Sequence, residues 1–336
     1  MTEDTVIYRK ALAPLDGSEI AEVVLAYVKE LAGRLGLDLL LLHVCRPEEY
    51  EMHPMHRMYI EHAAHLIRQH FASVHNNADR SATDKQNDVR GILTIGHPAE
   101  EILRCIDDND VDFIIMATHG HSARKRWSIG SVTDKVLRTS KVPVWLVRAG
   151  IPYELVHDRY PRITVLVPLD GSELAEAVFP HVEALAVQRG LERVDLVLLR
   201  VCEPTIIPSG YRADLSEDWA SYTEQRLNQD RQEAEKYLDT LAKNYQDAGI
   251  RVKTVVKTGQ PAAEIISFAD AHPLNLVVMA THGWSGHVWR PWGSVTEMVL
   301  EGISSPLLLV RPSQIGSDYQ EIKKGDVKKG ELSRSG

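Results

Sequence analysis

The chain has 336 residues, of which 44% are hydrophobic, and three cysteines, so it is long enough for two domains with separate cores and too poor in cysteine for a disulfide framework. Its formal net charge of -9 disfavours non-specific nucleic-acid binding, and it shows neither a signal-peptide pattern nor a run of about 18 apolar residues that could cross a bilayer. These properties predict a cytoplasmic protein that binds neither nucleic acid nor a membrane.

The first half of the chain alternates short apolar runs with amphipathic stretches, which is typical of a parallel sheet covered by helices on both faces. Strands are predicted at Lys10–Pro14, Asp38–Val44, Arg90–Ile95, Phe113–Ala117 and Val144–Val147.

Helices are predicted between these strands. Behind Ser18, which is suited to cap a helix N-terminus, four apolar residues follow at helical spacing. They are Val24, Tyr27, Val28 and Leu31. Pro98 fits the first turn of a later helix, and Gly130 precedes the last helical pattern of this half.

The second half repeats the first. Behind Ser172, a second candidate cap, Val178, Val182 and Leu185 repeat the apolar stripe of the first helix. LAPLDGSEIAEVV, from Leu12, returns as LVPLDGSELAEAV from Leu166, and MATHGHSARKRWSIGSVTDKVL, from Met116, returns as MATHGWSGHVWRPWGSVTEMVL from Met279. The offset grows from 154 to 163 residues. We expect the nine additional residues between the second and third strands of the second copy, in a loop or a longer helix.

This pattern predicts two domains, residues 1–150 and 151–312, each a five-stranded, doubly wound, Rossmann-like α/β unit with a parallel sheet. Residues 313–336 are rich in Lys, Glu, Gly and Ser, and we expect them to form a disordered tail. Ligands of such sheets bind at the carboxyl ends of the strands where the winding reverses, here the first and fourth strands of each repeat.

Two motifs recur at these strand ends. Asp16 and Asp170 follow the first strand, where a carboxylate can accept hydrogen bonds from ribose hydroxyls or an adenine amine but repels a phosphate. After the fourth strand, Gly130-Ser131 and Gly293-Ser294 open a helix and offer N–H groups, hydroxyl donors and a positive dipole end to an anion. Gly-Ser also suits an ordinary helix start, but the repetition of both motifs favours a nucleotide.

The motifs resemble those of the universal stress protein family, over about residues 8–148 and 162–311. The family's ATP-binding branch carries Gly-x2-Gly-x9-Gly followed by Ser or Thr after the fourth strand. Here Ala117 and Ala280 replace the first glycine, which is tolerated where φ is negative and costly where the turn is left-handed.

The resemblance implies two domains with the adenine nucleotide alpha hydrolase-like fold, related by a pseudo-twofold axis, each binding ATP with or without Mg²⁺. In the first repeat the implied contacts are Pro14, Leu15, Asp16, Val44 and Met116 for adenosine, and His119, Gly120, Gly130, Ser131, Val132 and Thr133 for the phosphates. In the second repeat they are Pro168, Leu169, Asp170, Val201, Met279, His282, Gly283, Gly293, Ser294, Val295 and Thr296. The two valines would act through their backbone, and a core role suits them equally.

The resemblance also implies that the fifth strands, near Val144–Val147 and Leu307–Val310, associate across the pseudo-twofold axis within the chain. A further homodimer and the protein partner stay open.

The predicted function is an ATP-binding stress or signalling protein that acts through nucleotide-dependent conformation. Two alternatives stay open, a slow ATPase and a nucleotide-free interaction module. The sequence has no P-loop and no acyl-transfer elbow, and it predicts no catalytic residue.

The nine-residue loops differ between the repeats. The first carries Arg124-Lys125-Arg126 and the second Trp289-Arg290-Pro291-Trp292. Because charge-assisted hydrogen bonds are stronger than neutral ones, we expect the first site to hold a triphosphate more tightly, unless the basic triplet is only a solvated face.

Six histidines gather in one segment, at His53, His56, His62, His65, His70 and His75. A metal site needs three or four converging ligands, and the segment contains no Glu-x-x-His pair or cysteine companion. We therefore expect surface and core histidines and no metal.

Overall fold

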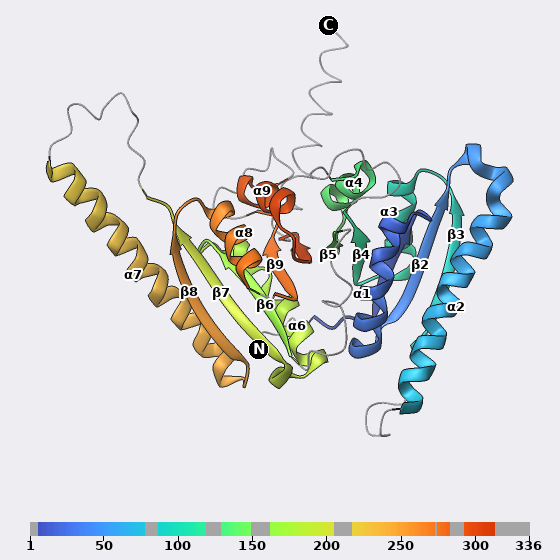
Figure 1. Cartoon of the computed structure of the whole chain (residues 1–336), viewed down its shortest axis with the longest axis horizontal. Coiled ribbons are helices and arrows are strands. Elements are labelled where there is room, and N and C mark those ends of the chain that lie inside the picture. The colour runs from blue at the N-terminus through green and yellow to red at the C-terminus, as the bar shows by residue number, and fades with distance from the viewer. Residues whose placement is uncertain are drawn as a thin grey trace, which may run out of the picture.

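The computed structural model describes residues 6–77, 87–118, 129–148, 162–204, 217–272, 274–282 and 292–312, so the segment between the repeats and the expected tail lie outside the described residues. Within these residues, ten strands form one continuous sheet (Figure 1). They are β1 (Lys10–Leu15), β2 (Asp38–Cys45), β3 (Val89–Ile95), β4 (Phe113–Ala117), β5 (Val144–Val147), β6 (Ile163–Leu169), β7 (Val194–Cys202), β8 (Arg251–Thr258), β9 (Leu276–Ala280) and β10 (Leu307–Val310).

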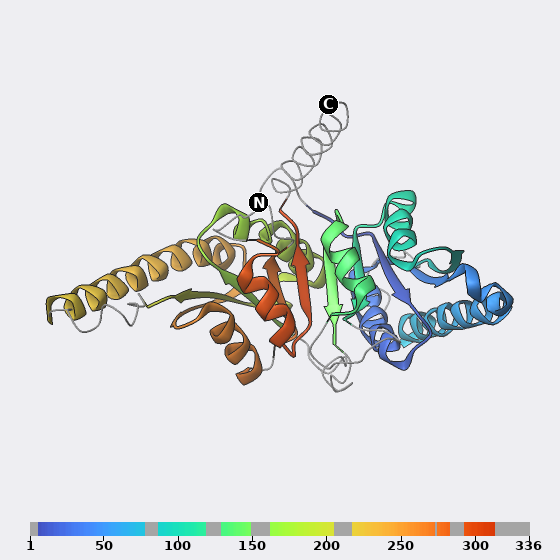
Figure 2. The ribbon, with the colours of Figure 1, turned by 90° about the horizontal axis from the view of Figure 1, so that it is seen from above.

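The order of the strands is β3-β2-β1-β4-β5-β10-β9-β6-β7-β8, and all neighbours run parallel except β5 and β10. Each repeat contributes five parallel strands, and its winding reverses between β1 and β4 or between β6 and β9. This confirms the doubly wound α/β prediction. The antiparallel pairing of β5 with β10 joins the repeats at the centre of the molecule (Figure 2).

Helices cover both faces of the sheet. They are α1 (Glu19–Leu35), α2 (His53–Asn77), α3 (Pro98–Asn109), α4 (Ser131–Thr139), α5 (Glu173–Glu176), α6 (Phe179–Arg189), α7 (Glu217–Asp247), α8 (Pro261–Ala271) and α9 (Ser294–Gly302), with short 3-10 helices η1 (Pro47–Met52) and η3 (Leu191–Arg193). One core layer contains α1, α2, α5, α6 and α7, and the other α3, α4, α8 and α9. Both layers include residues of both repeats, so the core continues across β5 and β10. No described helix is long and apolar enough to cross a bilayer.

The predicted caps position the first helices. The Ser18 hydroxyl accepts a hydrogen bond from the Ala21 N–H at 3.2 Å, and Ser172 accepts one from Ala175 at 3.1 Å, as expected of a serine at an N-terminus. Both helices therefore begin directly behind the strand end where the ligand is expected.

The first helix of the second repeat is interrupted between α5 and α6. Pro180 has no N–H, and in a continuous helix its ring would clash with the carbonyl of Glu176, which is the last residue of α5. The apolar stripe predicted for this helix nevertheless stays buried, at Val178, Val182 and Leu185.

The nine additional residues of the second repeat are divided between two connections, so their predicted location is only partly right. Leu15 pairs with His43, 28 residues later, whereas Leu169 pairs with Arg200, 31 residues later. Three residues are thus added before the second strand. The other six lie between the second and third strands, where α7 has 31 residues and α2 has 25.

Two arginines at equivalent positions connect the repeats. Arg148, after β5, donates through Nη2 to the Leu300 carbonyl at 2.6 Å and to that of Glu301, at the end of α9. Arg311, after β10, donates to the Arg138 carbonyl in α4. Each cation therefore meets the carbonyl end of a helix in the other repeat, where the helix dipole attracts positive charge.

Candidate functional site

A cavity of about 570 Å³ lies in the second repeat, at the carboxyl ends of β6, β7 and β9 and against the first turn of α9. Its lining includes ten of the eleven positions predicted for this repeat, which are Pro168, Leu169, Asp170, Val201, Met279, His282, Gly293, Ser294, Val295 and Thr296. The eleventh, Gly283, lies outside the described residues. The fold thus brings both motifs of the second repeat to one cavity.

The first turn of α9 presents backbone N–H groups at one side of this cavity. Gly293 is the N-cap, and the first intrahelical bond runs from the Glu297 N–H to the Gly293 carbonyl at 3.0 Å. The N–H groups of Ser294, Val295 and Thr296 therefore have no acceptor within the helix, which is the usual basis of anion binding at a helix N-terminus.

Thr133 and Thr296 fix these turns to the sheet. The Thr296 hydroxyl donates to the Ala280 carbonyl at 3.1 Å, and the Thr133 hydroxyl donates to the Ala117 carbonyl at the same distance. Both threonines are buried. Their hydroxyl protons are used inside the protein, so they can offer a ligand their N–H groups but not the hydroxyl protons expected from the sequence.

Alanine at the first position of the glycine motif fits the backbone. Ala117 and Ala280 are the last residues of β4 and β9, and among the described residues Asp110 is the only non-glycine with positive φ. The turn does not need a left-handed residue there, so the replacement of glycine by alanine causes no backbone strain.

The aspartates of the Asp-Gly-Ser motifs shape their own turns. Asp170 Oδ1 accepts from the N–H and hydroxyl of Ser172, at 3.0 and 2.6 Å, and Asp16 makes the same two contacts with Ser18. The glycine between them has φ of +80° in both repeats. The motif therefore has a local structural role in addition to the ligand contact predicted for it.

The side of the cavity opposite α9 is charged. Arg200, Glu203, Asp230 and Glu233 line it together with Asp170. None except Asp170 was predicted. A signal for Arg200 was present in the sequence, because it is the one charged residue in the stretch LVLLRVC of β7.

Arg200 is held in place by its neighbours. Its guanidinium carbon lies 5.5 Å from the centre of the Tyr237 ring, and the Tyr237 hydroxyl donates to Glu176 at 2.7 Å. A side chain at Gly171 would overlap this guanidinium. These contacts orient a cation at the rim of the cavity.

The first repeat places its predicted residues at the same strand and helix ends. Gly130 is the N-cap of α4, and its N–H donates to the Thr118 carbonyl at 2.9 Å, as that of Gly293 does to Thr281. Pro14, Leu15, Asp16, Val44 and Met116 lie at the ends of β1, β2 and β4. His119, Gly120 and the basic triplet lie outside the described residues.

The first repeat carries His43 at the strand position where the second carries Arg200. His43 is 3% exposed, its Nδ1 lies 2.9 Å from the Leu15 carbonyl, and its ring stacks on His56 at a centroid distance of 4.5 Å. Burial and the neighbouring His56 lower the pKa of His43, which favours a neutral ring. The two sites therefore differ in charge beside the first strand.

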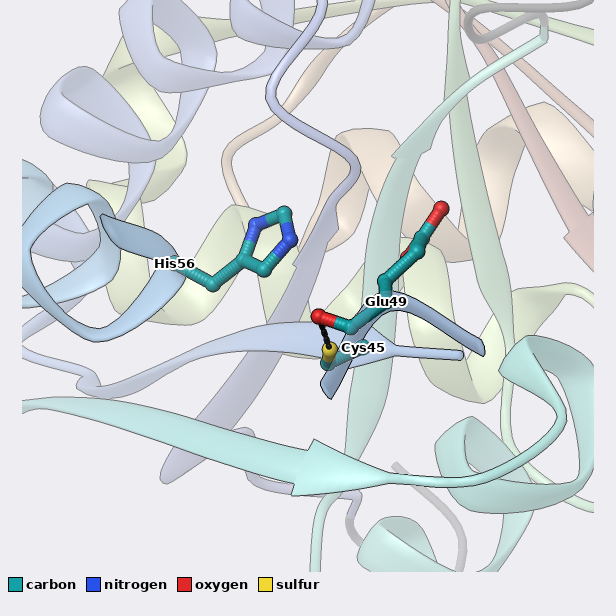
Figure 3. Close-up of side chains that lie close together, drawn as sticks. All are labelled: Cys45, Glu49 and His56. Atoms are coloured by element: carbon teal, nitrogen blue, oxygen red, sulfur yellow. Dashed lines mark hydrogen bonds between the residues drawn. The ribbon is translucent and has the colours of Figure 1, made fainter. Parts of the chain in front are cut away.

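A third group of side chains comes together next to this histidine. Cys45, Glu49 and His56 each offer one ligand atom within 4.8 Å of the other two (Figure 3). The histidine-rich segment lacks a cysteine in sequence, but the end of β2 supplies one in space. The sequence did not predict this group, because its three ligands come from β2, η1 and α2 and spacing within the histidine-rich segment does not show that the end of β2 lies beside it.

Trp292, next to the glycine turn of the second repeat, is buried at 3% exposure and does not line the cavity. The guanidinium of Arg138, from the first repeat, lies 5.9 Å from its ring. This tryptophan thus packs at the contact between the repeats.

Comparisons with known proteins agree with this architecture. The Universal stress protein family matches residues 7–148 and 162–311. Universal stress protein MJ0577 of Methanocaldococcus jannaschii is 30% identical over 157 residues, which cover 43% of this chain and 97% of that protein. A universal stress protein of Mycolicibacterium smegmatis is 26% identical over 255 residues, covering 75% and 78% of the two chains.

The crystal structure of a universal stress protein from Archaeoglobus fulgidus DSM 4304 shares the fold, with a TM-score of 0.61 and 20% sequence identity over 90% of this chain and 98% of that one. The family matches together span most of the chain and correspond to its two repeats. The chain therefore belongs to the universal stress protein family and carries two of its domains in tandem.

Proposed function

We propose that this protein binds ATP in the cavity of the second repeat and at the equivalent strand ends of the first, and that it acts in stress response or signalling in the cytoplasm through nucleotide-dependent conformation. The observation that carries the proposal is the cavity, because residues predicted from separate motifs line one volume of about 570 Å³. Small-molecule sites commonly enclose roughly 300–1,000 Å³. All three cysteines are free and buried, as a reducing compartment allows.

The two sides of the cavity suit the two ends of a nucleotide. The N–H groups at the start of α9 and the dipole of that helix attract phosphate oxygens. The carboxylates of Asp170, Glu203, Asp230 and Glu233 lie on the side of β6, β7 and α7, where they can accept from ribose hydroxyls or an adenine amine. We therefore orient the phosphates toward α9 and the adenosine toward β7.

We extend the proposal to the first repeat because its glycine turn and its Asp-Gly-Ser turn make the same hydrogen bonds. The two affinities should differ. His43 replaces Arg200 beside the adenosine side, and the triplet Arg124-Lys125-Arg126 favours tighter binding of a triphosphate, with or without Mg²⁺, in the first repeat.

Nucleotide content and ligand-induced stabilisation test the proposal. The purified full chain is heated to release bound small molecules, which are identified by mass, and is then titrated with ATP, ADP and GTP with and without Mg²⁺. We expect one or two adenine nucleotides per chain and, at a ligand concentration of 100 Kd, about 2.7 kcal/mol of added stability. Absence of any nucleotide together with an unchanged melting temperature in ATP would overturn it. Sustained phosphate release during the titration would assign ATP hydrolysis to the site.

A further inference from the structure

The corner between β2 and α2 gathers three different metal-ligand types from three successive elements. Cys45 ends β2, Glu49 lies in η1, and His56 lies in the first turn of α2. Within the described residues, this is the one group of three or more His, Cys, Asp or Glu side chains whose ligand atoms lie within 4.8 Å of one another. Figure 3 shows the imidazole of His56 facing the strand end that carries Cys45.

The corner is built by local hydrogen bonds that fix two of the ligands. The Arg46 N–H donates to Glu49 Oε2 at 3.1 Å, which closes the first turn of η1 on its own carboxylate. The Cys45 thiol is fully buried and points at the carbonyls of Arg46 and Glu49, at 3.5 and 3.4 Å. Thiol and carboxylate are thus positioned before any ligand arrives.

The histidine is oriented but incompletely satisfied. Nε2 of His56 is buried without a hydrogen-bond partner, and so is Nε2 of His43. The rings of His43 and His56 stack at a centroid distance of 4.5 Å with an interplanar angle of 23°. The contact of His43 Nδ1 with the Leu15 carbonyl fixes the His43 ring. A buried nitrogen without a hydrogen-bond partner costs free energy, which a bound cation would recover.

We propose that Cys45, Glu49 and His56 bind a divalent transition-metal ion, Zn²⁺, in the first repeat. This goes beyond nucleotide binding and does not depend on it. A thiolate, an imidazole and a carboxylate form a borderline-soft set that suits Zn²⁺, whereas Mg²⁺ and Ca²⁺ take oxygen ligands. The carboxylates of Glu48 and Asp16 near this corner add negative charge that favours a cation.

The ligand atoms of Cys45, Glu49 and His56, which lie within 4.8 Å of one another, must move slightly closer together to bind Zn²⁺. Zn²⁺ binds sulfur at about 2.3 Å and nitrogen or oxygen at about 2.0–2.2 Å, so tetrahedral ligand atoms lie roughly 3–4 Å apart. We expect small side-chain rotations of Glu49 and His56 on metal binding to reach that range, with Glu49 Oε2 kept near the Arg46 N–H and Cys45 unmoved. With three protein ligands, the fourth position of a tetrahedral Zn²⁺ would be taken by a water molecule.

The second repeat provides a matched control. Cys202 ends β7 as Cys45 ends β2, and it is also buried and free. It lines the cavity of the second repeat, and among the described residues it belongs to no three-ligand group.

Cobalt is the probe that tests the site, because a thiolate bound to Co²⁺ gives a charge-transfer absorption. Chelator-treated full-length protein is titrated with Co²⁺ and then with Zn²⁺. We expect one equivalent of Co²⁺ with the thiolate band, and its displacement by Zn²⁺. Cys45→Ser should abolish the band, and His56→Gln should weaken Co²⁺ binding by more than about tenfold. Cys202→Ser should leave both unchanged.

Circular dichroism of each metal-free variant verifies that it is folded. Absence of the band in the unaltered protein, its persistence in Cys45→Ser, or unchanged Co²⁺ affinity in His56→Gln would overturn the proposal. Nucleotide binding is a separate readout, so loss of either activity alone identifies which proposal fails.

Discussion

Ser294 and Ser131 occupy equivalent exposed positions, as the first residues of α9 and α4. Replacing Ser294 by Asp places a carboxylate where the phosphates are proposed to bind, while an acidic residue in a first helical turn keeps the helix stable. We expect Ser294→Asp to weaken the second nucleotide site by at least about tenfold, or about 1.4 kcal/mol. Calorimetric titration with ATP measures this loss.

Ser131→Asp is the matched control for that substitution. It should weaken only the first site, and both variants should melt at the temperature of the unaltered protein when no nucleotide is present. Unchanged ATP affinity in Ser294→Asp, or the loss of both sites in either variant, would contradict the assignment.

The sequence motifs that predicted the ligand site recur partly for structural reasons. Asp16 and Asp170 recur because each carboxylate, followed by a left-handed glycine, holds the serine that caps the next helix. Repetition of such a motif thus follows from the turn as well as from a ligand. Arg200 and His43 were missed because their importance depends on where a strand ends in space, and a single charged residue in an apolar run does not reveal this.

At the scale of the elements, β3 lies close against the backbone of α2 at Gly91. A Cβ at this position would lie 2.9 Å from the Ile60 carbonyl oxygen, which belongs to the backbone of α2. Because a helix backbone cannot move aside cheaply, we expect Gly91→Ala to lower the free energy of unfolding by about 1–3 kcal/mol. Urea unfolding followed by circular dichroism measures it.

The equivalent position of the second repeat supplies the control. Thr254 on β8 pairs with Leu198 as Gly91 pairs with Leu41, and its hydroxyl donates to Asp239 at 3.2 Å on the surface. Thr254→Ala should therefore cost less than about 1 kcal/mol. Equal losses in the two variants would show that the close approach of α2 is unimportant.

The sequence predicted the position of an element correctly where a single local feature, such as an apolar run, determines it. Apolar runs predicted the strands, and Phe113–Ala117 and Val144–Val147 match in full. The break between α5 and α6 was missed although Pro180 is visible, because the apolar stripe continues through it. The division of the nine additional residues needs strand register, which the offset between repeats does not contain.

At the scale of the whole molecule, β5 and β10 join the repeats, and this followed from the family resemblance rather than from periodicity. The side-chain contacts across the junction were not predicted, since Arg148 and Arg311 reach carbonyls more than a hundred positions away.

Hydrogen bonds to charged groups contribute about 1.5–3 kcal/mol, so Arg148→Ala should lower the free energy of unfolding by this amount. Urea unfolding should show a smaller loss for Arg311→Ala, whose contact is exposed. An unchanged midpoint in Arg148→Ala would contradict this role.

A second contact between the repeats makes stability depend on pH. His181 on α6 lies 2.8 Å, through Nδ1, from the hydroxyl of Tyr8, which precedes β1. Burial lowers the pKa of His181 to about 4, whereas an unfolded histidine has a pKa of about 6.5. The unfolded chain therefore takes up the proton first, so the stabilisation is complete above about pH 6.5 and is lost as the pH falls toward about 4. The full loss is about 3 kcal/mol, because the pKa differs by about 2.5 units and each unit corresponds to about 1.4 kcal/mol.

His181→Gln separates this contribution from those of other groups. The glutamine amide can accept from the Tyr8 hydroxyl but does not titrate, so the variant should keep its stability at neutral pH. The pKa of His43 and that of His70 are also lowered by burial, and the carboxylates titrate in both proteins, so these contributions cancel in the comparison. Urea unfolding at about pH 7.5 and about pH 5 should show a smaller decrease for His181→Gln than for the unaltered chain. If both proteins lose the same stability, His181 does not titrate between the repeats, and their contact is independent of pH.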